Sequence, residues 1–360
     1  MQQKIALPND AQDYSVLPPV SDGAVRATPL TPDIIYNILV GEIALQRQDL
    51  ASAYSHQLKG AALAHDAVAA ERATRIALYQ RNYADAQVAV KRWIQFAPED
   101  PQARQMAVML YIQLKDYRLA LQHLKSLVQL REEEGKDGFA YAIAAVTSGG
   151  DRPQAVKLMQ SLASNYQGNS RASYAVALTA VLAQQLDLAE REARRSIQDQ
   201  PDMDKAYILL SRIYMERKDS AEAMRIMQDA LNVMPDSTII HSAYARLLVD
   251  LDKPELAYKQ FQQLAKLMPD DADVQFSLGV LALQLERRTQ AEEHFNRLLK
   301  AGKRVDDASF YMGRIQEMDG KTKAAVDWYG RVKSGRYRFD AQVRTAGLVA
   351  KQGDLQQARS

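Results

Sequence analysis

Cysteine is absent from the 360-residue chain, which rules out several kinds of chemistry at the start. Structural disulfides, cysteine-ligated zinc and a thiol nucleophile are all excluded. No run of about 18 apolar residues is present, so the sequence predicts no membrane-spanning helix. An excess of positive charge is also missing, because the net charge is only +2. This balance, without a recognition motif, does not indicate nucleic-acid binding.

Catalytic and cofactor motifs are also lacking. No phosphate-binding loop or dinucleotide fingerprint occurs, and no convincing strand precedes a glycine-rich turn. Aspartates and glutamates interleave with lysines and arginines, which is typical of solvated helix faces. The histidines are far apart and none has a metal-ligand partner at helical spacing: His56, His65, His123, His241 and His294. We therefore predict a protein that is not an enzyme, with no cofactor and no metal site.

The chain does contain a constant period. Pro201, Pro235 and Pro269 stand 34 residues apart, and Ala223 and Ala257 have the same separation. Such a period indicates a helix–turn–helix unit that repeats. When Asp204 is position 1, six landmarks fall at positions 4, 7, 11, 20, 27 and 32: Tyr207, Leu210, Tyr214, Ala223, Ala230 and Pro235. This pattern resembles the tetratricopeptide repeat (TPR).

An alanine marks position 20 of every unit, at intervals of 33 to 35 residues: Ala53, Ala86, Ala120, Ala155, Ala189, Ala223, Ala257, Ala291, Ala325 and Ala358. The series predicts an all-α, right-handed TPR superhelix (an α-solenoid) over residues 31–360, with nine complete repeats and a partial tenth. Four residues before most markers stands a residue suited to cap the second helix: Asp49, Asn82, Asp116, Asp151, Asp219 and Asp354.

The two ends of the chain depart from the period. Residues 1–30 contain four prolines and no helical pattern, so we expect a flexible leader. The chain stops at Ser360, just after the second helix of the tenth unit begins, so we expect truncation of a longer array. The longest interval contains the Glu132–Glu134 triplet, for which we expect a solvated helix end. A docking site and a local bend are the alternatives.

The TPR resemblance implies that the first helices line a concave face, with positions 5 and 9 among those that point into it. We predict that this face binds a polypeptide through arginine forks and aromatic anchors. The alternative is that these side chains pair with neighbouring acids or pack between units. The predicted binding residues are Arg75, Met109, Tyr174, Leu178, Arg212, Arg246, Phe276, Phe310 and Arg314.

A closer resemblance rests mostly on residues 36–105. The segments that carry it are Leu39–Asp49, Ala70–Tyr79 and Trp93–Gln105. They resemble the N-terminal part of proteobacterial TPR outer-membrane lipoproteins. One member of that family is an adaptor that tethers a periplasmic carboxyl-terminal processing protease and activates it towards cell-wall hydrolases.

This resemblance implies a periplasmic adaptor whose partners are that protease and its protein substrates. It also implies a lipid anchor on an N-terminal cysteine after a signal peptide, and neither is in this sequence. The alternative is a general TPR assembly scaffold for an unrelated complex, periplasmic or cytoplasmic.

Overall fold

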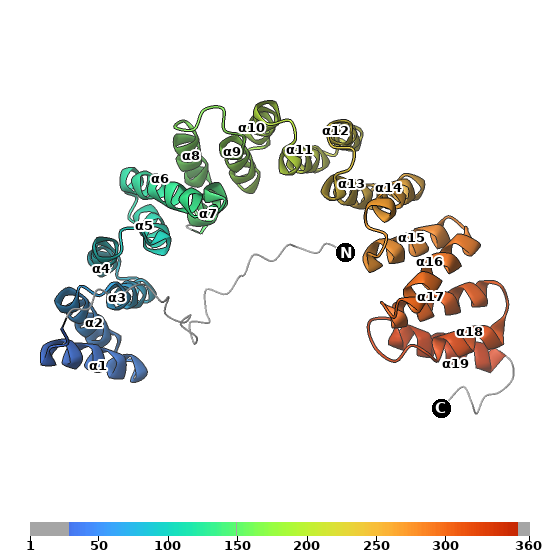
Figure 1. The fold of residues 1–360 in the computed structure, drawn as a ribbon, viewed down its shortest axis with the longest axis horizontal. Helices are drawn as coiled ribbons and strands as arrows, with labels where there is room; N and C mark the ends of the chain where they lie inside the picture. The colour runs from blue at the N-terminus through green and yellow to red at the C-terminus, as the bar shows by residue number, and fades with distance from the viewer. Residues whose placement is uncertain (1–28, 149, 352–360) are drawn as a thin grey trace. The chain divides into compact units, whose positions relative to one another are not determined.

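The structure, a computed structural model, describes residues 29–148 and 150–351. Within these ranges the chain forms nineteen α-helices and no strand, which confirms the all-α prediction. The helices follow one another as nine pairs and a nineteenth helix that begins a tenth (Figure 1). Most of the predicted leader, and the Asp354 and Ala358 positions, lie outside the described residues. None of the described helices is long and apolar enough to cross a bilayer.

The chain divides into two compact units. The first contains four helix pairs: α1 (Pro32–Gln46), α2 (Leu50–Ala64), α3 (Ala67–Tyr79), α4 (Tyr83–Phe96), α5 (Pro101–Gln113), α6 (Tyr117–Glu133), α7 (Gly138–Thr147) and α8 (Arg152–Ala163). The second contains the remaining helices: α9 (Ser170–Leu182), α10 (Leu186–Asp199), α11 (Asp204–Glu216), α12 (Ser220–Val233), α13 (Thr238–Asp250), α14 (Pro254–Leu267), α15 (Ala272–Gln284), α16 (Arg288–Lys300), α17 (Val305–Met318), α18 (Thr322–Tyr329) and α19 (Arg338–Lys351).

A residue with a left-handed backbone conformation recurs in the turn of each of the nine described helix pairs. Position 15 has a positive φ, between 52° and 77°, although only two of the nine residues are glycine: Gln48, Arg81, Lys115, Gly150, Gln184, Lys218, Asp252, Glu286 and Gly320. In the α11–α12 turn, the Lys218 N–H donates to Met215 and the Asp219 N–H donates to Tyr214. This is a Schellman motif, which satisfies the last carbonyls of the first helix.

The predicted caps begin the second helices as expected. Five side chains accept a hydrogen bond from the backbone N–H three residues later: Asp49, Asn82, Asp116, Asp151 and Asp219. The cap satisfies one of the unpaired donors of the first turn. Four other second helices, α10, α14, α16 and α18, begin without a side-chain cap.

Small residues set the contact between the two helices of a pair. The position-20 alanines are buried throughout the described residues. At position 8, a Cβ on Gly279 would lie 2.6 Å from the Phe295 ring, and a Cβ on Gly313 would lie 2.6 Å from the Tyr329 ring. These two glycines therefore allow an aromatic side chain of the second helix to lie against the first helix.

The glutamate triplet has a structural role that the sequence did not predict. Glu132 accepts the backbone N–H of Gly138 at 2.8 Å, at the start of α7. Glu134 forms ion pairs with Arg131 and Lys136 at 2.8 and 3.0 Å. The triplet lies at the end of α6 with Glu133 and Glu134 exposed, as expected of a solvated helix end, and Glu132 and Glu134 also hold the turn between α6 and α7.

Candidate functional site

The first helices of successive repeats form one layer in the second unit. α11 contacts α13, and α15 contacts α17. Their position-5 and position-9 residues define what we call the first-helix face: Ile208, Arg212, Ser242, Arg246, Phe276, Val280, Phe310 and Arg314. The repeat places equivalent residues of this face one unit apart along the layer.

Three arginines stand at position 9 of this face. The Arg212 side chain is 55% exposed and its Nε lies 3.6 Å from Glu216. Arg246 is exposed and forms no ion pair or hydrogen bond within residues 29–148 and 150–351. The guanidinium of Arg314 lies 5.8 Å from the Tyr311 ring. The positive charge of Arg246 is therefore not neutralised by an ion pair within the described residues.

Two of the three predicted aromatic residues, Phe276 and Phe310, are placed differently from these arginines. Phe276 and Phe310 are 7% and 4% exposed, so neither ring is open to solvent. The Arg304 guanidinium lies 3.8 Å from the centre of the Phe276 ring. Tyr337 stacks on Phe310 with ring centroids 4.5 Å apart. Residues of other segments cover both rings, which is the packing alternative that the sequence left open.

The remaining predicted residues are divided between the two units. Arg75 on α3 forms an ion pair with Glu71 at 2.8 Å, and Met109 on α5 is half-buried. Both belong to the first unit. Tyr174 and Leu178 are half-buried on α9 in the second unit. For Arg75, pairing with a neighbouring acid is the alternative that the sequence left open.

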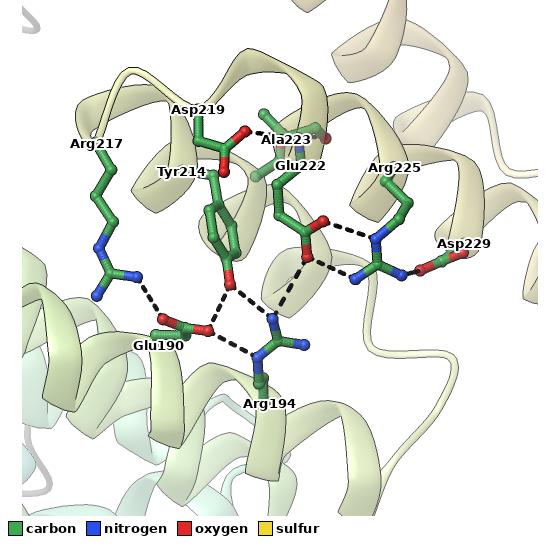
Figure 2. A network of polar contacts seen from close by, with 10 residues as sticks. Glu190, Arg194, Tyr214, Arg217, Asp219, Glu222, Ala223, Arg225 and Asp229 are labelled. Carbon is green, nitrogen blue, oxygen red and sulfur yellow. Dashed lines mark hydrogen bonds and ion pairs between the residues drawn. The ribbon is translucent and has the colours of Figure 1, made fainter.

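A polar network that sequence reasoning missed joins two repeats of the second unit (Figure 2). Tyr214 on α11 donates a 2.5 Å hydrogen bond to Glu190 on α10, and Arg194 donates to both residues. Arg217 also binds Glu190. Burial raises the pKa of Glu190, but the three hydrogen bonds outweigh it and lower that pKa to about 2. The network continues through Glu222 to Arg225 and Asp229.

Four of the five histidines belong to the same kind of hydrogen-bonded pair, three at position 23 of their repeats and His241 at position 4. Each is bonded across its helix pair between positions 4 and 23: Asn37 with His56, Arg104 with His123, His241 with Gln260 and Gln275 with His294. Burial, together with Arg104, lowers the pKa of His123 to about 4. The described residues contain no group of three or more acidic or histidine side chains arranged to hold a metal ion. These histidines therefore act as cross-helix hydrogen-bonding residues.

Tetratricopeptide repeat models match residues 180–247 in one case and residues 243–303 and 281–336 in another. Together with the nine helix pairs, these matches show an all-α fold built from TPR-type repeats. Among curated proteins, the TPR repeat-containing protein PA4667 of Pseudomonas aeruginosa is 36% identical over 351 residues. That match covers 95% of this chain and 59% of PA4667, so the chain spans less than two thirds of this relative.

Solved structures with similar repeats align more distantly. PilF of Pseudomonas aeruginosa aligns with 17% identity and a TM-score of 0.40, over 53% of this chain and 87% of PilF. PilW, described as a widely conserved type IV pilus biogenesis factor, aligns with 19% identity and a TM-score of 0.39, over 53% of this chain and 89% of PilW. Likenesses at this level concern the repeat fold alone.

Proposed function

We propose that this TPR protein binds a polypeptide partner through the first-helix face of its second unit. Arg246 carries the proposal, because its exposed guanidinium forms no ion pair or hydrogen bond among the described residues. Arg212 stands at the equivalent position of the preceding repeat and Arg314 at that of the second repeat on, so the first-helix face carries three arginines. A guanidinium binds a carboxylate through two parallel hydrogen bonds, which suits acidic side chains of a bound chain.

The resemblance of residues 36–105 also suggests which partner this face binds. We propose that the protein is an adaptor, tethered to the outer membrane from the periplasmic side, which binds a carboxyl-terminal processing protease and presents cell-wall hydrolases to it. The lipoprotein resemblance of residues 36–105 supports this, as does the 36% identity to PA4667 as a TPR repeat-containing protein. A general assembly scaffold for another complex is the second candidate, supported by the repeat fold itself.

The test is a titration of the purified processing protease of the source organism into this chain by calorimetry. We expect measurable binding by the wild type and at least tenfold weaker binding by the Arg212→Ala/Arg246→Ala/Arg314→Ala variant. A hydrogen bond to a charged group contributes about 1.5–3 kcal/mol, which corresponds to roughly tenfold or more. Binding should also weaken with added salt, because exposed charges are screened.

Arg225→Ala is the matched control. Arg225 is also 55% exposed, but it lies on α12 and already pairs with Glu222 and Asp229. This variant should bind like the wild type. Equal affinity of the triple variant and the wild type would refute the arginine face. No binding by the wild type would refute the protease assignment and leave the scaffold.

A further inference from the structure

Residues 330–337 leave the helical pattern and form a connection that we call the strap. α18 has 8 residues, whereas α12 and α14 have 14 each. α12 and α14 end at position 30 of their repeats, but α18 ends at position 24. Gly330, Ser334 and Gly335 fall in the stretch where helix would otherwise continue, and Gly335 has a φ of 79°. These residues disfavour helix, so the chain turns away after Tyr329.

A carboxylate on the first helix of the same repeat fixes the middle of the strap. Asp306 on α17 accepts the backbone N–H of Lys333 at 2.7 Å and the hydroxyl of Ser334 at 2.6 Å. Val332 is buried, at 7% exposure. The strap is therefore held against α17 through a backbone donor and through side chains.

The end of the strap lies over two first helices. Tyr337 stacks on Phe310 of α17 with the ring planes inclined by 4°, and its hydroxyl lies 3.1 Å from that of Tyr311. The Arg336 guanidinium lies 4.6 Å from the Tyr337 ring and 5.7 Å from the ring of Phe276, on α15 of the preceding repeat. The strap therefore covers the position-5 side chains of two neighbouring repeats.

This arrangement has the features of a bound peptide. A non-helical segment gives a backbone N–H to a carboxylate, places one aromatic ring flat against another, and lays a cation beside aromatic rings. The last two contacts are favourable stacking and cation–π geometries. Phe276 and Phe310 stand at position 5, where the repeat pattern predicts contact with a partner. In this chain Tyr337 of the strap contacts Phe310.

We propose that Phe276, Phe310, Tyr311 and Asp306 form a peptide-binding site that the strap occupies in cis. Its external ligand is an extended peptide with an aromatic residue preceded by a basic residue, the chemistry that Arg336 and Tyr337 display. The inference rests on the proposed use of the first-helix face, but not on its three arginines or on the protease. A segment tethered in cis has a high effective concentration, so an external peptide must displace the strap in order to bind.

The experiment measures fluorescence anisotropy of a labelled synthetic peptide with the sequence of residues 331–338. The protein is the full chain, either wild type or as Ser334→Gly/Tyr337→Gly, which removes two strap anchors and leaves the site residues intact. We expect the double variant to bind the peptide at least tenfold more tightly than the wild type. The same peptide with alanine in place of its tyrosine should bind at least tenfold more weakly to that variant.

Arg331→Ala is the control within the strap. Arg331 lies over Trp328, 4.0 Å from its ring, and no contact links it to the Phe276–Phe310 cluster. The Arg331→Ala variant should therefore bind the peptide as weakly as the wild type does. If the double variant fails to fold, Tyr337→Ala alone should give the same order of affinities.

The proposal is overturned if the folded strap variant binds the peptide no better than the wild type. It is also overturned if the peptide without tyrosine binds equally well. Because this test changes no arginine of the position-9 set and uses no protease, its failure leaves the proposed function standing. Failure of the protease titration likewise leaves this result unaffected.

Discussion

Tyr337 lies flat on Phe310, with ring centroids 4.5 Å apart, although α18 separates the two residues in the chain. Phe310 belongs to the first helix of the ninth pair and Tyr337 precedes the first helix of the tenth. The stack therefore ties the last described helix to the repeat before it. It also explains why Phe310 is buried at a position that the TPR pattern assigns to an open face.

The stack and the hydroxyl contact of Tyr337 should be separable. Tyr337→Phe keeps the stack and loses only the hydrogen bond to Tyr311, which should cost about 0.5–1.5 kcal/mol of unfolding free energy. Tyr337→Ala also loses the ring pair, which should cost about 0.5–1.5 kcal/mol more, besides the lost apolar burial. Urea unfolding measures both. Equal destabilisation by the two variants would show that the stack contributes nothing.

Gly279 and Gly347 should respond in opposite directions to alanine. A Cβ at Gly279 would lie 2.6 Å from the Phe295 ring, whereas a Cβ at Gly347 has nothing within 4 Å. We expect Gly279→Ala to lower the unfolding free energy by about 1–3 kcal/mol, the usual cost of overpacking. Gly347→Ala should raise it by about 0.5–1 kcal/mol through helix propensity.

Both glycine variants can be compared by thermal unfolding under one set of conditions. Their shared helical setting makes Gly347→Ala the control for the added methyl group itself. If Gly279→Ala stabilised the protein, the Phe295 ring would have to move aside without an energetic cost. This result would contradict the close packing of Gly279 against Phe295.

The Lys218→Gly substitution should stabilise the protein. The φ of 64° at Lys218 places this residue in the left-handed region, which costs a non-glycine residue about 1–2 kcal/mol. Glycine avoids that cost but gains entropy in the unfolded chain, so we expect a net stabilisation of about 0.5–1 kcal/mol. Lys218→Ala retains the Cβ and should show no gain. A Lys218→Gly protein no more stable than Lys218→Ala would contradict the Schellman assignment.

The Glu190 network should make the unfolding free energy depend on pH in the acidic range. The folded pKa of Glu190 is lowered to about 2, below the ordinary carboxyl value near 4.5. Its contribution is therefore complete above about pH 4.5 and is lost as the pH falls towards 2. Glu190→Gln should be less stable than the wild type at pH 6, and the difference should shrink as the pH approaches 2.

Melting temperatures across this pH range test the prediction. Glu216→Gln is the comparison, because Glu216 also pairs with an arginine, at the looser distance of 3.6 Å. It should change the pH profile less than Glu190→Gln does. A gap between Glu190→Gln and the wild type that stays constant down to pH 2 would exclude the network as the cause.

Much of the fold was predictable because the period is local and repeated. The caps of Asp49 and Asp219 followed from one residue type at one offset, and the structure contains both. The positive φ at Lys218 was not predictable from residue type, since lysine does not favour it. The Schellman hydrogen bonds impose it, and only the recurrence of position 15 reveals it.

The candidate site was predicted less completely. Arg246 is exposed on the first-helix face, as its position 9 in the repeat predicted. Phe276 and Phe310 occupy the predicted helices but are covered, since Arg304, Arg336 and Tyr337 come from other segments. Whether these residues bind a partner stays a prediction that the experiments above address.

The sequence by itself determined the all-α fold, the number of helix pairs in the described chain and the residues at which five of the second helices begin. These depend on spacing, caps and small residues within about 34 residues, a distance that one repeat contains. Only the tertiary structure decided that the strap covers Phe310 and that Glu190 joins two repeats. Those contacts arise between segments 24 or more residues apart, and side-chain packing rather than local pattern selects them.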